Sequence, residues 1–256
     1  MARQQLQLIA LPGIPLVEPG DDLSALIMAA LDRVHEKLRD GDVLVLAQKI
    51  FSKSENRYAY LNTVVPSERA IELAAQADKD PRIVELILRE SVAVLRVRKG
   101  AIIVEHRNGY VHAHAGIDQS NIASQSDNPR VLLLPENPDA SAARLREQLH
   151  VATGAEVAII INDSAGRAWR NGVIGFALGT AGFNPLENRI GTRDLFGRAL
   201  EVTEIAVADE LAAAASFLMG QAAEGSPVVL IRGANISRAE VDSKSLIRAR
   251  EQDMFR

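Results

Sequence analysis

The sequence predicts a mixed α/β or α+β fold, in which mixed sheets are flanked by helices, and not a doubly wound Rossmann fold. Short runs rich in Val and Ile, typical of buried strands, are interspersed with segments of helical periodicity. These segments do not alternate as regularly as the strands and helices of parallel βαβ units. Neither the dinucleotide pattern G-x-G-x-x-G nor the Walker A loop G-x-x-x-x-G-K-[ST] occurs in the chain. Any nucleotide is therefore expected to bind without these phosphate loops.

In the N-terminal half, Asp22 is a natural N-cap, and apolar residues recur at helical spacing over residues 23–38. Residues 66–90 have a helical pattern that Asp80-Pro81 interrupts, and Asn108-Gly109 predicts a tight hairpin turn. The expected strands of this half are residues 5–11, 43–46, 92–97, 101–106 and 110–114.

In the C-terminal half, Asp139 is expected to cap a helix that ends near Leu149. Residues 204–218 predict an alanine-rich helix that ends near Gly220. The expected strands are residues 131–134, 158–161 and 227–232. Residues 172–182 are rich in glycine and apolar residues and could pack at a subunit interface, and residues 237–256 predict a polar tail or helix.

Composition and charge exclude several classes of function. The net charge of −4 argues against a general nucleic-acid-binding protein, which needs a basic face. No cysteine is present, which excludes disulfides, thiolate metal sites and a cysteine nucleophile. The chain has no apolar run approaching the ~20 residues that span a bilayer, and its start lacks a secretory signal pattern. We therefore expect a cytoplasmic protein that binds neither nucleic acid nor membrane, organised as one domain over residues 1–256.

The most informative segment is AIIINDSAGRAWRNG at residues 158–172. A buried strand that stops at Asp163-Ser164 would place a carboxylate and a hydroxyl at the end of a sheet, where such oxygens suit Mg²⁺ or Mn²⁺. Arg167 and Arg170 follow closely enough to reach anionic oxygens. The alternative is a capped strand end with solvated arginines.

A second acidic segment, Asp118-Gln119-Ser120-Asn121, follows the predicted hairpin. If Asp118 and Asp163 converge, they could hold divalent cations that neutralise the phosphates of a nucleotide. The alternative is a pair of unrelated turn aspartates.

Three further groups of polar residues are weaker candidates. Lys49 and Lys53, after Gln48, share one face whether the segment is helical or extended, although a solvated basic edge is the usual fate of such a cluster. Residues 219–226 read as a helix C-terminus that exposes backbone donors. His112 and His114 would share a strand face and could form a zinc pair, but no third ligand is evident, so we interpret them as polar residues of a sheet face.

Six segments, taken together and in order, resemble the coenzyme F420-0:γ-glutamyl ligases. They span about residues 6–234, and such an ordered set is far more specific than any one motif. The segments are GIPLVEPGDDL at 13–23, DGDVLVLAQKIFSK at 40–53, AGIDQSN at 115–121, INDSAGRAWRNG at 161–172, DLFGRALEVTEIAVADELAAAA at 194–215 and MGQAAEGSPVVLIRG at 219–233. The resemblance implies a ligase domain alone, without the flavin-binding domain fused to it in some relatives, built as one unit or as two intertwined subdomains.

The resemblance also implies a reaction. A GTP-dependent ligase joins the amine of L-glutamate to the lactyl-phosphate carboxyl of F420-0 through an acyl phosphate, releases GDP and phosphate, and adds further γ-linked glutamates. The family uses Mn²⁺ or Mg²⁺ at two sites, is helped by K⁺ and typically forms homodimers. Two alternatives stay open, namely the same chemistry on another phosphorylated or carboxylated acceptor and a GTP-binding regulator without catalysis.

Matched position by position, the resemblance assigns Asp118 and Asp163 to one metal, and Ser164 and Gln221 to a second. Lys53 would offset phosphate charge, and Arg167 and Arg170 are our own candidates for the substrate phosphate or the glutamate carboxylates. The implied nucleotide contacts are Ile14, Pro15, Leu16, Val17, Gln48, Lys53, Asn121, Met219, Gly220, Gln221, Ala222, Ala223, Glu224, Gly225 and Ser226. Three positions depart from the family pattern: Ser164 stands where threonine is usual, Asn162 where a hydroxyl residue is common, and Gln48 where some relatives have serine.

Overall fold

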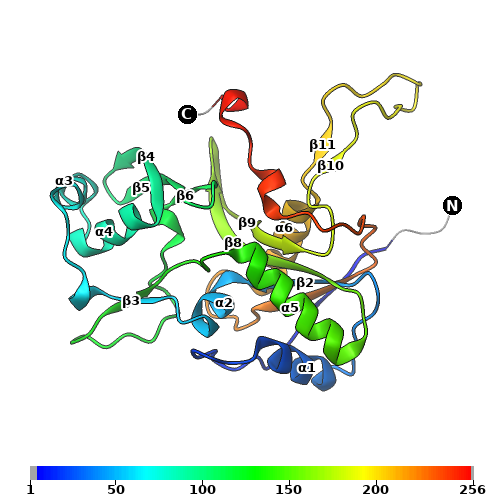
Figure 1. Ribbon diagram of the computed structural model, residues 1–256, viewed down its shortest axis with the longest axis horizontal. Helices are drawn as coiled ribbons and strands as arrows, with labels where there is room; N and C mark the ends of the chain where they lie inside the picture. The colour runs from blue at the N-terminus through cyan, green and yellow to red at the C-terminus, as the bar shows by residue number, and fades with distance from the viewer. Residues whose placement is uncertain (1–4, 255–256) are drawn as a thin grey trace.

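The computed structural model describes residues 5–254, and its largest element is a mixed five-stranded sheet (Figure 1). The strand order is β1-β12-β2-β8-β9. Only β2 and β8 run parallel, and the other neighbours are antiparallel. The five strands are β1 (Gln7–Ala10), β2 (Val43–Ala47), β8 (Ala158–Arg167), β9 (Arg170–Ala181) and β12 (Val228–Arg232). This architecture confirms the predicted mixed fold.

Helices cover both faces of the sheet, which explains why its central strands are apolar throughout. Alternate residues such as Leu44 and Ile159 pack on one face with α1 (Leu23–Arg33) and α5 (Pro138–Thr153). The intervening residues pack on the other face with α6 (Val207–Met219). Because side chains alternate across a strand, a strand buried on both faces has a continuous apolar sequence.

A second cluster of buried residues lies beside the main sheet, at the left of Figure 1. Its sheet, in the order β4-β5-β6, consists of Ser91–Arg98, Ala101–His106 and Val111–Ala113. It packs on α3 (Glu68–Ala77) and α4 (Pro81–Arg89), which are separated at the predicted break because the Asp80 side chain caps α4. A short sheet of β3 (Tyr58–Tyr60) and β7 (Arg130–Leu132) completes this part.

Two of the expected helices have different bounds in the structure. The helix expected over 23–38 ends at Arg33, and His35 adopts a left-handed conformation with φ of 56°, although Leu38 is still buried. The cap of α5 is Asn137 rather than Asp139. The Asp139 carboxylate instead accepts hydrogen bonds from Thr180 N and from Ser243.

The central strand does not stop at Asp163, so that part of the prediction is wrong. Strand β8 runs on to Arg167 and pairs with β9, so that residues 172–182 lie almost entirely within a strand. Strand β2 ends opposite Asn162, where a bulge also interrupts the β8–β9 ladder. Asp163 therefore still lies at the edge where β2 ends, although β8 and β9 continue past it as a two-stranded ribbon.

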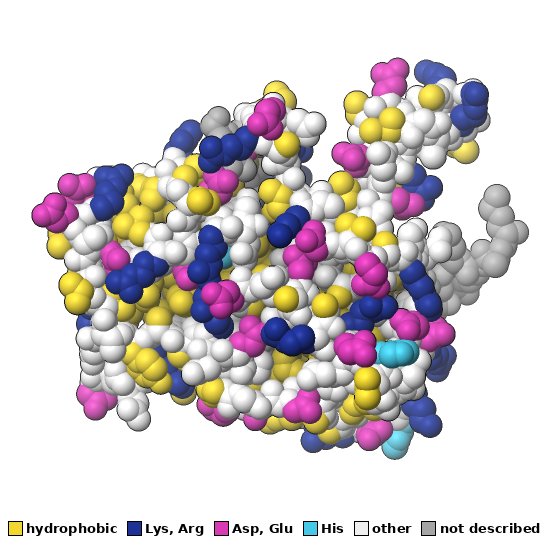
Figure 2. Space-filling model, in the orientation of Figure 1, with side chains coloured by type: hydrophobic (Ala, Val, Ile, Leu, Met, Phe, Trp, Pro, Cys, Tyr) yellow, Lys and Arg dark blue, Asp and Glu magenta, His cyan; other side chains and the backbone are white. Residues whose placement is uncertain are grey.

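The remaining segments extend from these two parts. Strands β10 (Glu187–Asn188) and β11 (Glu204–Ile205) form the base of an arm that stands off the main body (Figures 1 and 2). The C-terminal tail contains only two short 3₁₀ turns, Ser243–Leu246 and Arg250–Gln252, so within its described part the helix alternative is wrong. The other 3₁₀ turns are Leu61–Thr63 and His114–Gly116. Across residues 5–254, no helix has the length and apolar character needed to cross a membrane.

Candidate active site

A cleft of about 450 Å³ opens where β2 ends, at the carboxyl ends of the parallel pair β2 and β8. Open mixed sheets place their ligand sites at such edges. The cleft brings together the four predicted metal ligands and every predicted nucleotide contact. Its lining residues are Ile14–Val17, Ala47–Ile50, Lys53, Asp118, Ser120, Asn121, Asn162–Ser164, Ser216 and residues 219–227.

The first wall of the cleft is α2 (Gln48–Ser54), which begins directly after β2. Lys49 and Lys53 therefore lie one helical turn apart, as the helical alternative predicted. Gln48 is buried, and its Nε2 donates to Asp118 Oδ2 at 2.6 Å, while Ser52 Oγ donates to Gln48 Oε1 at 2.8 Å. The amide nitrogen of Gln48 is therefore hydrogen-bonded to the Asp118 carboxylate.

Asp118 lies in the segment after β6 and faces α2 across the cleft. Its backbone N–H and C=O both bond to Leu132, which ties the segment to β7. Lys49 Nζ lies 2.9 Å from Asp118 Oδ2. Burial raises the pKa of Asp118 above its usual range, the nearby Asp163 adds to this, and Lys49 opposes it without cancelling it. Two carboxylates held this close in a half-buried cleft favour a bound cation.

Asp163 is fixed by its own backbone and by the second sheet. Ser164 N donates to Asp163 Oδ1 at 2.8 Å, and His112 Nε2 lies 3.2 Å from Oδ2. Burial lowers the pKa of His112, but the Asp163 carboxylate outweighs this, so the net shift is upward. His112 of β6 therefore faces the Asp163 carboxylate from the second sheet.

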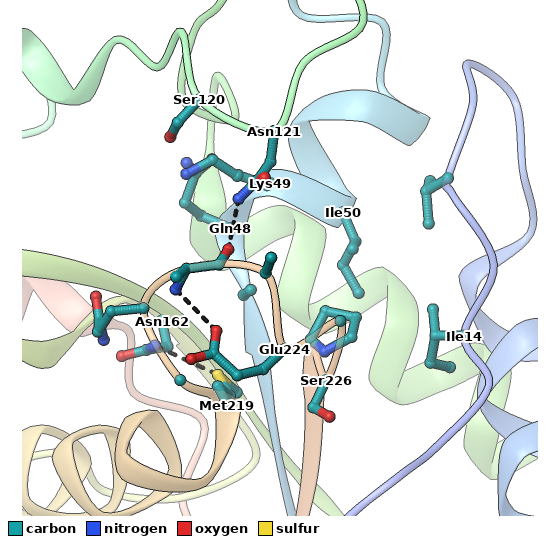
Figure 3. Close-up of a pocket in the computed structure, with 18 of the residues that line it drawn as sticks. Ile14, Gln48, Lys49, Ile50, Ser120, Asn121, Asn162, Met219, Glu224 and Ser226 are labelled. Atoms are coloured by element: carbon teal, nitrogen blue, oxygen red, sulfur yellow. Dashed lines mark hydrogen bonds between the residues drawn. The ribbon is translucent and has the colours of Figure 1, made fainter.

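The loop at residues 219–226 forms the opposite wall (Figure 3). Asn121 Nδ2 donates to Ala222 O at 2.9 Å, and Ala222 N donates to Glu224 Oε2 at 2.8 Å. Lys53 Nζ donates to Asn121 O at 3.0 Å, and partial burial lowers the pKa of Lys53. Gln221 Nε2 donates to Ser216 Oγ at 2.8 Å, which leaves its amide oxygen for another partner.

Asn162 occupies the floor of the cleft. It is buried, its Oδ1 has no hydrogen-bond partner, and its Nδ2 lies 3.6 Å from Met219 Sδ. A Cβ at Gly175, on the neighbouring strand, would meet Asn162 Oδ1 and the α6 backbone at about 2.5 Å. Glycine at this position therefore lets α6 and Asn162 approach the ribbon closely.

Arg167 and Arg170 do not line the cleft. Both lie on the β8–β9 ribbon, where Arg167 Nη2 donates to Asn171 O at 3.3 Å and Arg170 is exposed. The pairing of β8 with β9 carries them beyond the sheet edge, whereas a turn after Ser164 would have folded them back. Their substrate-binding role stays a prediction.

The interpretation of the two histidines is wrong in one respect. His112 is buried against Asp163, while His114 lies beyond the end of β6 with φ of 55°, so the two are not alternate residues of one strand. Within residues 5–254, no three His, Asp or Glu side chains gather as a metal site by themselves. A cation at Asp118 and Asp163 would need further oxygen ligands, which Ser164 and Gln221 can supply and which suit Mg²⁺ or Mn²⁺.

Sequence reasoning missed the partners of the two aspartates. The sequence indicates Lys49 only as part of a basic cluster, whereas the structure pairs it with Asp118. His112 contacts Asp163, which lies 51 positions further along the chain. Helical spacing groups Lys49 with Lys53, but it does not indicate the contact of Lys49 with Asp118. No sequence signal indicates His112, because the contact joins two different sheets.

Paired carboxylates beside two lysines and an open loop at a sheet edge are an arrangement chemically suited to a phosphorylated ligand together with divalent cations. Residues 13–233 match the family model described as F420-0:Gamma-glutamyl ligase. A protein named "Coenzyme F420:L-glutamate ligase" from Methanothermobacter thermautotrophicus is 47% identical, covering 98% of this chain and 99% of that protein. Proteins of the same name from Methanocaldococcus jannaschii and Archaeoglobus fulgidus are each 40% identical, covering 99% and 98% of this chain and 98% and 97% of theirs. The chain belongs to the F420-0:γ-glutamyl ligase family.

Proposed function

We propose that this protein is a GTP-dependent ligase that joins L-glutamate to coenzyme F420-0 through an acyl phosphate, releases GDP and phosphate, and adds further γ-linked glutamates. The names of relatives that match over almost their entire length support the glutamate and F420 substrates. The observation that carries the proposal is the convergence of Asp118, Asp163, Lys53 and the loop at residues 219–226 on one cleft.

The first step requires the substrate carboxylate to approach the γ-phosphate, although both are negatively charged. Lys53 lies at the cleft wall where it can bind phosphate oxygens, and Lys49 is close by on the same helix. Two divalent cations, Mn²⁺ or Mg²⁺, held by Asp118 and Asp163 and by Ser164 and Gln221, would supply the remaining positive charge. Attack of the glutamate amine on the acyl phosphate then forms the amide and expels phosphate.

The nucleotide is proposed to lie between residues 14–17 and the loop at residues 219–226. Leu16 is exposed at the cleft rim, where it can cover an aromatic base. Asn121 connects its own segment to this loop through its hydrogen bond to Ala222 O. The backbone N–H and C=O groups of such a loop can form hydrogen bonds with the edge of a base.

Purified protein should convert F420-0, L-glutamate, GTP and Mn²⁺ into products heavier by one or more glutamyl residues in mass spectrometry. Omission of GTP or chelation of the metal should abolish the product, and GDP should appear in proportion to it. Absence of glutamyl product with Mn²⁺ or Mg²⁺ and with GTP or ATP would contradict the proposal.

Asp163→Asn should lower turnover at least about 100-fold, because it removes a charged oxygen ligand from the cation site without changing the shape of the side chain. Chemical denaturation should show a fold as stable as the wild type. Asp127→Asn, which alters an exposed acid outside the cleft lining, is the matched control. Wild-type turnover in Asp163→Asn would refute the assigned role.

A different acceptor is a second candidate, favoured by the unpartnered Oδ1 of Asn162 on the cleft floor. This buried acceptor atom can select a substrate that offers a hydrogen-bond donor. Gln48, another departure from the family pattern, already donates an amide hydrogen to Asp118. Acceptor profiling by mass spectrometry separates the two candidates.

GTP binding without GDP release for every acceptor would instead indicate the non-catalytic regulator. A homodimer, stimulation by K⁺ and a cytoplasmic location stay predictions.

A further inference from the structure

The two aspartates of the cleft are held by contacts that cross between the two parts of the molecule. Asp118 lies in the chain that leaves the β4-β5-β6 sheet, and it contacts Gln48 and Lys49 at the end of the main sheet. Asp163 lies on β8 of the main sheet, and it contacts His112 of β6. Each part of the molecule therefore orients the carboxylate that the other part supplies.

The His112 ring is fixed on several sides. Only 9% of its side chain is exposed, Nδ1 lies 2.8 Å from Ala113 O, and the Phe176 ring lies 5.6 Å from the imidazole between centroids. Strand β6 pairs His112 with Val104 of β5, so the backbone beneath the ring is also held. The remaining nitrogen, Nε2, is buried and faces Asp163 Oδ2 at 3.2 Å as an ion-pair contact rather than a well-aligned hydrogen bond.

We propose that His112 is a positioning residue that sets the orientation of the Asp163 carboxylate for cation binding. The inference rests on the proposed function, since it takes Asp163 as a metal ligand. Ser164 N holds Oδ1 and His112 holds Oδ2, so the carboxylate plane is determined from two directions. Groups that contact a metal-ligating side chain in this way commonly determine metal affinity without touching the metal.

The proposal is tested by the binding of Mn²⁺ to the full chain in the presence of GDP, measured by electron paramagnetic resonance of the free ion. His112→Leu removes the polar contact, and we expect its Mn²⁺ affinity to fall about 10–100-fold. His112→Gln places an amide nitrogen close to the position of Nε2, and we expect affinity within a few-fold of the wild type. This rescue by a side chain of similar reach is not expected of a residue that only fills space.

His106→Leu is the matched control. His106 is also buried, on the neighbouring strand β5, and it stacks on Tyr110 and faces Glu90 instead of Asp163. This variant should lose stability in chemical denaturation and keep its Mn²⁺ affinity. If His112→Leu fails to fold, His112→Asn takes its place, because its amide is too short to reach Oδ2.

Three results would overturn the inference. Wild-type Mn²⁺ affinity in His112→Leu would show that the contact does not position Asp163. An equal loss in His112→Gln and His106→Leu would show that packing alone is responsible. Absence of Mn²⁺ binding in the wild type would overturn the proposed metal site and this inference with it, whereas the first two results leave the proposed ligase function standing.

Discussion

Lys53 is the residue for which burial and charge matter most directly to ligand binding. Its ammonium donates to Asn121 O at 3.0 Å, and burial lowers the pKa of the group. A lysine that is partly desolvated binds a phosphate oxygen more strongly than a fully hydrated one, because less water must be displaced. Lys53 is therefore suited to bind an anion, as the proposed nucleotide site requires.

Lys53→Met should weaken GTP binding about 10–100-fold, because it removes a charged donor and keeps the aliphatic stem. Isothermal titration with GTP and Mn²⁺ measures the loss. Lys37→Met, at an exposed lysine outside the cleft lining, should bind GTP as the wild type does. Equal affinity of the two variants would exclude Lys53 from the nucleotide site.

At the scale of elements, the loop after α6 depends on the conformation of Gly220. This residue has φ of 75° and ψ of −179°, a combination that is almost restricted to glycine. A Cβ on Gly220 would also overlap the Glu224 carboxyl, which accepts from Ala222 N. The backbone conformation of this turn therefore requires glycine, whereas the overlap would be relieved if the exposed Glu224 side chain moved and lost its hydrogen bond to Ala222 N.

Gly220→Ala should lower the free energy of unfolding by about 1–3 kcal/mol and weaken GTP binding through the displaced loop. Adding Glu224→Ala should recover part of the stability, because it removes the steric overlap but not the backbone strain. Denaturant titration of both variants measures the two contributions. No difference from the wild type in Gly220→Ala would contradict the loop conformation.

A second contribution to stability comes from Glu90, a buried acid that lies between the end of α4 and the start of β4. Glu90 lies 3.2 Å from Arg57 Nη2 and 3.1 Å from Arg107 Nη2. Burial would raise the pKa of Glu90, but the His106 ring and the two guanidinium groups outweigh it, so the pKa is lowered. A carboxyl with a lowered folded-state pKa stabilises the fold above its unfolded pKa, and this contribution is lost as pH falls through the folded value.

Glu90→Gln should cost about 1–3 kcal/mol of unfolding free energy at pH 7, because it removes the counter-charge of two partly buried guanidinium groups. The difference from the wild type should shrink as pH falls below about 4.5, the ordinary value for glutamate. Denaturant titration over a pH series measures this trend. Glu72→Gln, in an exposed pair with Arg69, should change stability by no more than ~0.5 kcal/mol.

At the scale of the whole molecule, the C-terminal tail connects the two parts of the structure. Ser243 is buried and its Oγ lies 3.0 Å both from Leu178 O on β9 and from Asp139 Oδ2 on α5. Further along, Ile247 lies against Gly109 of the predicted hairpin turn, and Arg250 Nη2 donates to Glu105 at 2.8 Å. The tail thus runs from the main sheet to the β4-β5-β6 sheet (Figure 1).

Removal of residues 242–256 should lower the unfolding free energy by about 2–4 kcal/mol, because it removes the hydrogen bonds of Ser243 to Asp139 and Leu178 O and exposes the apolar surface under Leu246 and Ile247. A shorter truncation that removes residues 248–256 should have little effect, because it spares Ser243 and loses a contact of an exposed arginine. Chemical denaturation of both proteins checks the difference. Equal stability of the longer truncation and the wild type would show that the tail does not hold the two parts together.

The surface available to a second subunit also depends on the whole molecule. Residues 177–181, within the apolar stretch 172–182, are buried between helices of the same chain, so they cannot form a subunit interface. Large apolar side chains are instead exposed on the arm between β10 and β11, where Leu195 and Phe196 are 100% and 82% exposed. An apolar pattern in the sequence indicates that a residue is buried, but it does not indicate whether the same chain or a second subunit covers it.

The sequence by itself determined the family and the mixed fold, and the family resemblance named most of the residues that line the cleft. Apolar runs such as 158–161 predict strands wherever they pack, and Asp80-Pro81 starts a helix through its own cap. Only the tertiary structure decided that β8 continues past Asp163, that Arg167 lies outside the cleft and that His112 faces Asp163. Strand pairing and contacts between sheets depend on residues that are distant in the sequence, and no local sequence pattern predicts them.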